Sequence, residues 1–426
     1  MTKSKAILAS TMVAGAILHG AAGNAQNASG SKDDAIRPFK VHVSDAEIAD
    51  LRRRVKATVW PQKENESGTD NTQGVRLATM QALAKYWATD YDWKKCEAKI
   101  NAVPNFITTI DGVDIHFIEV KSKHKNALPI IITHGWPGSI IEQMKIIGPL
   151  TDPTAYGGKE EDAFDVVIPS LPGYGFSGKP TSTGWNGDRI AKAWITLMDR
   201  LGYKKFAAAG GDWGNNVTEH IALFAAAGQV VGIHTNMPAA LSPEVSKALN
   251  AGGPAPAGFS ADEQHAWEQL IYFWKYRLGY AIEMANRPQT LYGIMDSPVG
   301  LAAWIIDHDT KSEELIERVF AGETEGLSKD DLLDNISMYW FSKTAISSAQ
   351  LYYEDKRAFF DVRGVQIPVG VSAFADEIYQ APESWVKAAY PKLIHYNRLP
   401  KGTHFAAWEQ PAAYVSELRA TFKTLR

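Results

Sequence analysis

Gly210-Gly211-Asp212-Trp213-Gly214 lies between an apolar run, KKFAAA, and a helix-like stretch, NNVTEHIALFAAAG. A strand, a tight turn of the form Gly-x-nucleophile-x-Gly and a helix together make a nucleophile elbow. Glycines suit this turn because it is sharp and brings neighbouring backbone close. The pentapeptide therefore predicts that Asp212 is presented after a strand, at a position where serine is more usual.

The carboxylate of Asp212 changes the chemistry that an elbow supports. With an ordinary pKa of about 3.9 it is anionic at neutral pH without a general base, and the N-terminus of the following helix favours that ionised form. A carboxylate attacks carbonyls weakly, but it displaces a leaving group at an activated sp3 carbon and forms an alkyl-enzyme ester. The alternative is structural, because Asp is common at helix N-caps. The pentapeptide alone leaves both interpretations open.

A second motif, HGWPG at 134–138, follows the apolar run LPIIIT. A Gly/Pro-rich loop after an early strand supplies one backbone N–H of the oxyanion hole in folds with this elbow, and the residue after the nucleophile supplies the other. We assign these N–H groups to Trp136 and Trp213, which would act when water attacks the ester. For the His134 side chain we expect a structural role in the turn. The Trp136-Pro137 bond is a candidate cis peptide.

The third motif, KGTHFAA at 401–407, follows the run LIHYNRLP near the C-terminus. His404 lies after the last expected strand, where the base of a triad belongs in the chain order nucleophile, acid, His. It would deprotonate the water that hydrolyses the ester. The acid should follow the preceding run, IPVGVSAF, where Asp376 and Glu377 are adjacent. Composition does not choose between these two carboxyls.

The rest of the chain predicts an α/β-hydrolase fold, a mostly parallel sheet flanked by helices with a helical cap insertion. Short apolar runs that end in turn residues recur over 105–237 and 348–426, and they are typical of strands buried on both faces. The intervening segment, 238–347, is helical and aromatic-rich, which indicates a cap inserted into one domain. Asp111-Gly112 between two β-rich runs predicts a hairpin.

The N-terminal region predicts three further segments. Residues 1–25 have the layout of a secretory signal peptide, with two early lysines, an uncharged apolar run and a cleavage-like site ending at Ala25. The apolar run is shorter than the about 20 residues that span a bilayer, so we expect cleavage near Ala25 and an exported protein, periplasmic or secreted, without a stable membrane anchor. Residues 26–36 are typical of a disordered lead-in, and 37–104 of a helical arm that begins with a capping box at Ser44.

Composition narrows the possible partners. The net charge of −4 over 426 residues offers no general basic face for nucleic acid or an anionic membrane, so we expect neither. Cys96 is the single cysteine and lies in a polar stretch, which predicts a half-exposed structural thiol. No phosphate loop, metal-ligand cluster or dinucleotide fingerprint occurs in the required context, so we expect no cofactor.

Three motifs in order, HGWPGS, GGDWG and GTHFAAWEQP, closely resemble those of the microsomal-type epoxide hydrolases. That group includes insect juvenile-hormone epoxide hydrolases and related fungal and bacterial enzymes. The resemblance runs from about Arg37 to the end of the chain and includes the N-terminal arm. It implies Asp212 as the nucleophile and His404 as the base. The family's acid is the fourth residue of a Phe-Pro-x-[Glu/Asp] motif, which here reads FADE and implies Glu377, with alanine in place of the proline.

The resemblance also implies two proton-donating tyrosines in the cap. Tyr280 follows glycine and precedes a segment ending Asn-Arg-Pro, and Tyr352 ends the stretch SSAQLY. Leu351 replaces an aromatic residue of the family pattern, and Tyr353 is adjacent. Two phenols can hydrogen-bond to the epoxide oxygen and donate a proton as the C–O bond breaks. Without this match, packing would be the default role for each of the 16 tyrosines.

The resemblance therefore implies an epoxide hydrolase, an enzyme acting on ether bonds, which uses water to convert a small apolar epoxide to a vicinal diol. The closest alternative is a haloalkane dehalogenase, which shares the Asp nucleophile and His base but releases halide to N–H donors. A catalytically silent α/β-hydrolase used as a binding module is less favoured, because Asp212, Glu377 and His404 are all present. The sequence leaves open which epoxide is the substrate and with what regio- and enantioselectivity it is opened. Detoxification and catabolism of aromatic hydrocarbons are both compatible physiological roles. The oligomeric state is also open, and a homodimer is compatible with the sequence.

Overall fold

The structure, a computed structural model, describes residues 34–65, 73–323 and 326–426. The expected signal peptide and residues 26–33 of the expected lead-in lie outside the described residues. The described chain forms a nine-stranded sheet in the order β1-β2-β3-β5-β4-β6-β7-β8-β9. Its strands are β1 (Arg37–Pro38), β2 (Asn105–Ile110), β3 (Val113–Val120), β4 (Leu128–Thr133), β5 (Phe164–Pro169), β6 (Phe206–Gly210), β7 (Val230–Thr235), β8 (Val369–Asp376) and β9 (Leu393–Thr403).

The sheet is mostly parallel, as the sequence predicts. β4 pairs in parallel with β5 and β6, and the parallel order continues through β7, β8 and β9. Among the described strands, antiparallel pairs occur only towards the β1 end of the sheet, where β1 pairs with β2, β2 with β3, and β3 with β5. Every residue of β6 is buried, as expected for an apolar strand covered on both faces. The predicted α/β-hydrolase fold is therefore confirmed.

Two local sequence signals form as expected. The hairpin between β2 and β3 turns at Asp111 and Gly112, whose φ angles of 52° and 79° are the left-handed pair of a type I′ turn. The capping box opens helix α1 (Asp45–Lys56): the Ser44 side chain accepts from the N–H of Glu47, and the Glu47 carboxylate accepts from the N–H of Ser44. Both signals depend on neighbouring residues alone, which explains why the sequence reveals them.

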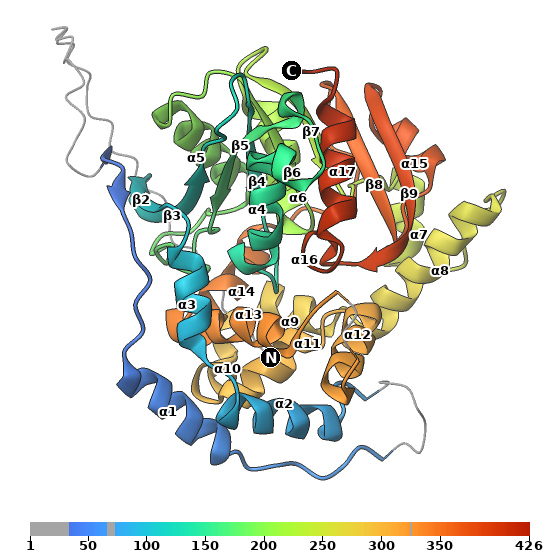
Figure 1. Cartoon of the computed structure of the whole chain (residues 1–426). Helices are drawn as coiled ribbons and strands as arrows, with labels where there is room; N and C mark the ends of the chain where they lie inside the picture. The colour runs from blue at the N-terminus through green and yellow to red at the C-terminus, as the bar shows by residue number, and fades with distance from the viewer. Residues whose placement is uncertain (1–33, 66–72, 324–325) are drawn as a thin grey trace, which may run out of the picture.

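Helices flank the sheet (Figure 1). α4 packs against α17, and α5 packs against α6. The core helices are α4 (Met144–Thr151), α5 (Gly187–Arg200), α6 (Trp213–Phe224), α15 (Glu383–Ala389), α16 (Ala406–Glu409) and α17 (Pro411–Phe422), and short 3₁₀ helices lie at Ile140–Gln143, Pro153–Tyr156, Glu160–Asp162 and Pro288–Thr290. Of the described helices, none is both long enough and apolar enough to cross a bilayer.

The first two helices of the N-terminal arm lie along the cap, on the side away from the sheet, and its last helix leads back towards β2 (Figure 1). After α1, it forms α2 (Leu77–Thr89) and α3 (Trp93–Asn101). α2 packs against cap helix α12 (Thr310–Ala321), and α1 packs against cap helix α11 (Pro298–Ile306). The arm therefore packs against the cap and stabilises its position.

In the N-terminal region, the expectation for Cys96 is wrong, and the expected lead-in differs at its described end, residues 34–36. Cys96 is fully buried rather than half-exposed, because α3 turns Trp93, Cys96 and Ile100 towards the core at helical spacing. The described end of the expected disordered lead-in is held in place, because Asp34 forms an ion pair with Arg200 at 2.7 Å. The short strand β1, which the sequence did not indicate, then pairs with β2.

The cap is inserted between β7 and β8, and Figure 1 shows its helices gathered beside one edge of the sheet. The expected boundary at 347 falls inside α14, which continues to Glu354 because Leu351 and Tyr352 lie on its buried face. Besides α11 and α12, the cap helices are α7 (Pro243–Asn250), α8 (Ala261–Tyr276), α9 (Gly279–Asn286), α10 (Tyr292–Asp296), α13 (Lys329–Ser342) and α14 (Ala345–Glu354).

Candidate active site

Asp212 occupies the turn between β6 and α6 with φ 53° and ψ −130°. A non-glycine residue with positive φ is strained, which is typical of a nucleophile elbow. Close backbone approaches explain the flanking glycines. A Cβ on Gly214 would lie 2.0 Å from the carbonyl oxygen of Thr133, and one on Gly135 would lie 2.3 Å from Oδ1 of Asp212. Larger residues at these positions would displace the turn or the carboxylate.

Asp212 occupies the N-cap position of α6, but within the described chain its side chain makes no cap hydrogen bond. Its Oδ1 instead accepts a 2.7 Å hydrogen bond from the N–H of Trp136, across the sheet edge. The Trp213 N–H also stabilises the ionised carboxylate. A capping role alone therefore does not account for Asp212, whose carboxylate is served by the two tryptophan N–H groups assigned from the sequence.

The loop that carries Trp136 is held by His134. Its Nδ1 lies 3.0 Å from the carbonyl oxygen of Gly135, and its Nε2 accepts from the N–H of Leu171 at 3.1 Å. The expected structural role of His134 is confirmed. The Trp136-Pro137 peptide bond is cis, as expected.

His404 follows β9 directly and is brought to the nucleophile. Its Nε2 lies 3.8 Å from Oδ2 of Asp212, and its Nδ1 lies 2.7 Å from Oε1 of Glu377. The other oxygen of Glu377 accepts from the side-chain amide of Asn236 at 2.9 Å. The structure thus brings Glu377 to the imidazole, whereas Asp376 has charged residues of the cap helix α12 as its neighbours.

Burial and charge act in opposite directions in this cluster. Burial disfavours the imidazolium of His404, but the carboxylates of Glu377, Asp212 and Asp309 outweigh that effect and raise its pKa to about 10. Burial also raises the pKa of Asp212, while the charge of His404 acts to lower it. Asp212 and His404 therefore form a buried ion pair.

The two cap tyrosines pack against the tryptophans whose N–H groups serve the nucleophile. Tyr280 of α9 stacks on Trp136 with ring centroids 4.7 Å apart, and Tyr352 of α14 meets Trp213 edge-on at 4.9 Å. Burial, followed by the charge of Asp212 among other groups, raises the pKa of both phenols well above the ordinary value. Tyr353 is 46 % exposed, whereas Tyr352 is 8 % exposed, so the structure separates these neighbours.

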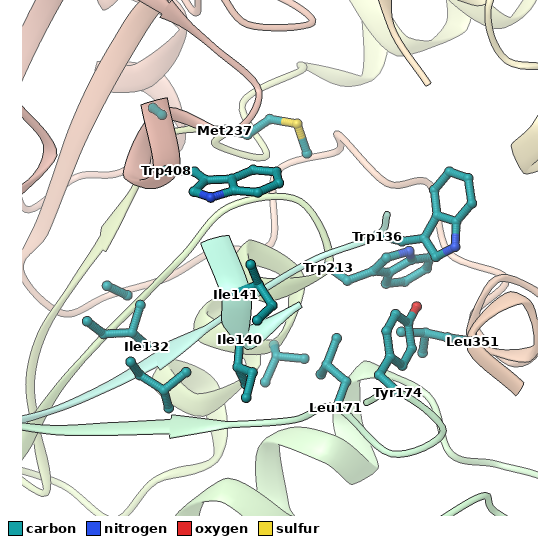
Figure 2. Close-up of a cluster of buried hydrophobic side chains, with 14 of the residues drawn as sticks. Ile132, Trp136, Ile140, Ile141, Leu171, Tyr174, Trp213, Met237, Leu351 and Trp408 are labelled. Carbon is teal, nitrogen blue, oxygen red and sulfur yellow. The ribbon is translucent and has the colours of Figure 1, made fainter. Parts of the chain in front are cut away.

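Two cavities meet Asp212. The larger, of about 260 Å³, includes Asp212, Tyr280 and Tyr352 in its walls, which are otherwise mainly apolar. The smaller, of about 20 Å³, lies against Asp212 and His404 and is also lined by Glu142 and Asn236. Figure 2 shows buried side chains of this region, with Trp136, Trp213 and Met237 among them. The carboxylate of Asp212 therefore lines both a large, mainly apolar cavity and a small polar cavity.

Sequence reasoning missed four polar residues around Asp212 and His404: the buried Asn236, His308 and Asp309, and the half-buried Glu142. The ring of His308 lies 4.5 Å from that of His404 although the two residues are far apart in the chain. Within the cap sequence, 238–347, the one adjacent pair of a histidine and a following aspartate is His308-Asp309. No neighbouring residues indicate that this pair lies beside the nucleophile.

Comparison with known proteins agrees with this geometry. Residues 36–143 match the family described as "Epoxide hydrolase N terminus", and residues 129–227 match the "alpha/beta hydrolase fold". A putative epoxide hydrolase of Stigmatella aurantiaca is 48% identical over 393 residues, covering 92% of this chain and 86% of the relative. The chain belongs to the epoxide hydrolase family. It is an enzyme of the class of hydrolases that act on ether bonds.

Other members of the epoxide hydrolase family extend the comparison. Epoxide hydrolase 1 of Oryctolagus cuniculus is 36% identical over 410 residues, covering 91% of this chain and 89% of the relative. The crystal structure of the Bombyx mori juvenile hormone epoxide hydrolase matches with a TM-score of 0.80 at 28% identity, covering 92% of this chain and 95% of the other. The Aspergillus niger epoxide hydrolase matches with a TM-score of 0.77 at 27% identity, covering 92% and 97%.

The ion pair of this epoxide hydrolase predicts a titration effect. Since the pKa of His404 is raised from 6.5 to about 10, its charge stabilises the fold fully below about pH 6.5, and this contribution is lost as the pH rises through about 10. Asp212→Asn removes one of the negative charges responsible, so the pKa of His404 should fall in that variant. NMR titration of histidine-labelled protein measures it.

Asp376→Asn is the matched control, because Asp376 is not among the main groups that set the pKa of His404. Its His404 titration should coincide with that of the unmodified enzyme. An unchanged His404 pKa in Asp212→Asn would show that the two side chains are not coupled.

Proposed function

We propose that this epoxide hydrolase opens a small apolar epoxide by attack of the Asp212 carboxylate on a ring carbon, and that water then hydrolyses the ester to a vicinal diol. One observation carries the proposal. The imidazole of His404 lies 3.8 Å from Oδ2 of Asp212, and the phenols of Tyr280 and Tyr352 line the large cavity together with that carboxylate.

In the first step, a carboxylate oxygen bonds to an epoxide carbon as the bond from that carbon to the ring oxygen breaks. Oδ1 of Asp212 is held by the N–H of Trp136, which leaves Oδ2 to attack. The ring oxygen takes a proton from Tyr280 or Tyr352, whose raised pKa keeps the phenols protonated before the reaction. An ester on Asp212 and a tyrosinate result.

In the second step, water gives a proton to Nε2 of His404 and its oxygen attacks the carbonyl carbon of the ester. Negative charge develops on Oδ1 of Asp212, where the N–H groups of Trp136 and Trp213 stabilise it. Collapse breaks the bond to the alkyl oxygen, which takes the proton from His404 and leaves as the diol. The proton remaining on the carboxyl returns to the tyrosinate. Glu377 holds the imidazole in place through Nδ1.

The small cavity supports a separate supply of water. Its volume of about 20 Å³ exceeds the about 10–15 Å³ that one water needs. Asp212, His404, Glu142 and Asn236 are among the residues that line it, whereas Tyr280 and Tyr352 line the large cavity. Burial raises the pKa of Glu142 to about 8, so at neutral pH its carboxyl is mostly protonated and can donate a hydrogen bond to that water.

The charges around His404 support the order of the two steps. In the free enzyme the negative charge of Asp212 helps to hold a proton on His404. Ester formation removes that charge and lowers the pKa of the imidazole. The imidazolium then releases its proton to solvent, so a neutral base is available when the ester is ready for hydrolysis. His404 takes up a proton again when the charge of Asp212 returns at the end of the cycle.

The cap phenols favour an epoxide over a haloalkane. A leaving alkoxide needs a proton, which Tyr280 and Tyr352 can give, whereas a halide needs none. A purely binding role predicts that a catalytic group is missing or out of reach, but Asp212, His404 and Glu377 form a connected set. The apolar residues that line the large cavity favour a largely apolar substrate: Met237, Phe273, Trp274, Leu278, Phe359 and Phe360.

Tyrosine variants assayed with epoxides and haloalkanes test this function. Tyr280→Phe or Tyr352→Phe should slow ester formation by about tenfold, since one donor remains, and the double variant by about 10²–10⁴-fold. Single-turnover kinetics and diol quantification with styrene-, terpene- and fatty-acid-type epoxides measure these losses.

Tyr353→Phe serves as the control and should retain full activity, because this tyrosine is exposed and outside the cavity. Full diol formation by the double variant would refute the tyrosine role. Halide release from haloalkanes without turnover of any epoxide would refute the function.

A further inference from the structure

A second imidazole, with no part in the mechanism proposed above, faces the nucleophile. His308 lies between α11 and α12 and is 1 % exposed. Its ring centroid lies 4.5 Å from that of His404 and 5.1 Å from that of Tyr280. Among the described residues, its buried Nε2 has no hydrogen-bond partner. A buried polar atom without a partner is costly, so a ligand that accepts the lone pair would stabilise this arrangement.

Three side chains converge at this point. Asp212, His308 and His404 each offer one ligand atom, and these atoms lie within 4.8 Å of one another. Oδ2 of Asp212 and Nε2 of His404 are 3.8 Å apart. Zn²⁺ binds nitrogen and oxygen at about 2.0–2.2 Å, so each of the three ligand atoms needs to move by less than about 1 Å towards a shared ion.

Each histidine also has a carboxylate on its other nitrogen. Glu377 lies 2.7 Å from Nδ1 of His404, and Asp309 lies 2.9 Å from Nδ1 of His308. Asp309 is itself fixed by the N–H of Ser312 at 2.9 Å. A carboxylate on the second nitrogen is the usual support of a metal-binding histidine, because it places the proton on Nδ1 and leaves the Nε2 lone pair free.

We propose that Asp212, His308 and His404 form a binding site for a divalent cation of the zinc type, and that the bound ion inhibits the enzyme. Two imidazoles and one carboxylate suit Zn²⁺, Co²⁺ and Ni²⁺, whereas Mg²⁺ and Ca²⁺ prefer sites made of oxygen ligands. Binding of the ion displaces the Nε2 proton of the His404 imidazolium to solvent. The ion then occupies the lone pairs that the proposed function assigns to attack and to proton abstraction. Inhibition therefore rests on the proposed function, and binding does not.

Calorimetric and kinetic titration of the chelator-treated full chain with ZnCl₂ tests the proposal. One ion should bind per chain, diol formation should fall at least about tenfold at saturation, and EDTA should restore it. MgCl₂ should have no effect on either measurement. His308→Ala removes a ligand and should weaken Zn²⁺ binding and inhibition by about 100-fold or more, while Asp309→Asn should weaken them by about 10–100-fold.

The matched control is His124→Ala. His124 also lies beside two carboxylates, Asp152 at 3.3 Å and Glu160 at 3.9 Å, but it is outside the site. This variant should retain the full response to Zn²⁺.

Three outcomes separate the alternatives. The proposal is overturned if Zn²⁺ does not bind. It is also overturned if Zn²⁺ binds and inhibits His308→Ala, Asp309→Asn and the unmodified enzyme equally. Binding that is lost in His308→Ala but does not inhibit supports the cation site and contradicts the roles proposed for Asp212 and His404. Binding with inhibition, both weakened in the His308 and Asp309 variants, supports the whole proposal. Asp309→Asn keeps the test decisive if His308→Ala does not fold.

Discussion

Asp212→Ala is expected to lower kcat/KM for diol formation by at least about 10⁴-fold, a loss of the size seen when other enzymes lose their nucleophile. The reason is chemical: without the carboxylate no ester forms, and water must attack the epoxide directly. Asp212→Asn should lose a similar factor, and it avoids placing alanine at a position with φ 53°. Diol quantification over long incubations measures the residual rate.

The control for this loss is Asp376→Ala. Asp376 is a carboxyl at the end of β8, in the next sequence position to Glu377, but it faces the charged side chains of α12. Its activity should stay within a few-fold of that of the unmodified enzyme, and circular dichroism should show that all three variants are folded. Full diol formation by either Asp212 variant would show that another group attacks the epoxide.

His404→Gln is expected to trap the ester. Attack by Asp212 does not use the base, so a single turnover should still alkylate the enzyme within about tenfold of the normal rate. Hydrolysis of the ester loses general-base catalysis, which is worth about 10²–10⁴-fold. The alkyl-enzyme should therefore accumulate, and mass spectrometry should locate the added mass on the peptide that contains Asp212.

His308→Gln, assayed with a chelator present, is the matched control. It makes the same substitution in the other imidazole of the site, whose ring lies 4.5 Å from that of His404. Under the proposed mechanism only the His404 variant accumulates the adduct. An adduct in the His308 variant alone would assign the base to His308, and its absence from both would contradict the ester.

Local and periodic signals in the sequence predicted most of the fold correctly. The elbow around Asp212, the turn at Asp111-Gly112 and the Ser44 capping box depend on a few adjacent residues, whose steric limits and hydrogen bonds act over that range. Errors arose where packing over longer distances decides the outcome. The burial of Cys96 depends on which face α3 turns to its neighbours, and the end of the cap depends on what α14 covers.

Pairs of adjacent candidates show the same limit within the site. Asp376 and Glu377 differ by one residue at the end of a strand, where successive side chains point to opposite sides. Tyr352 and Tyr353 differ by one residue on a helix, where successive side chains point about 100° apart. Motif resemblance favoured Glu377 and Tyr352, but the structure places each pair relative to the nucleophile: Glu377 lies 2.7 Å from His404, and Tyr353 is exposed.

The sequence by itself determined that Asp212 is presented on a nucleophile elbow and that His404 follows the last strand. It could do so because parallel strands place their carboxyl ends at one edge of the sheet, so that chain order implies proximity. The two phenols were implied by motif resemblance, but only the tertiary structure placed them beside Asp212 and added a small polar cavity and the imidazole of His308. These groups come from the cap and from loops, and their positions depend on how helices pack over the sheet, which no local pattern encodes.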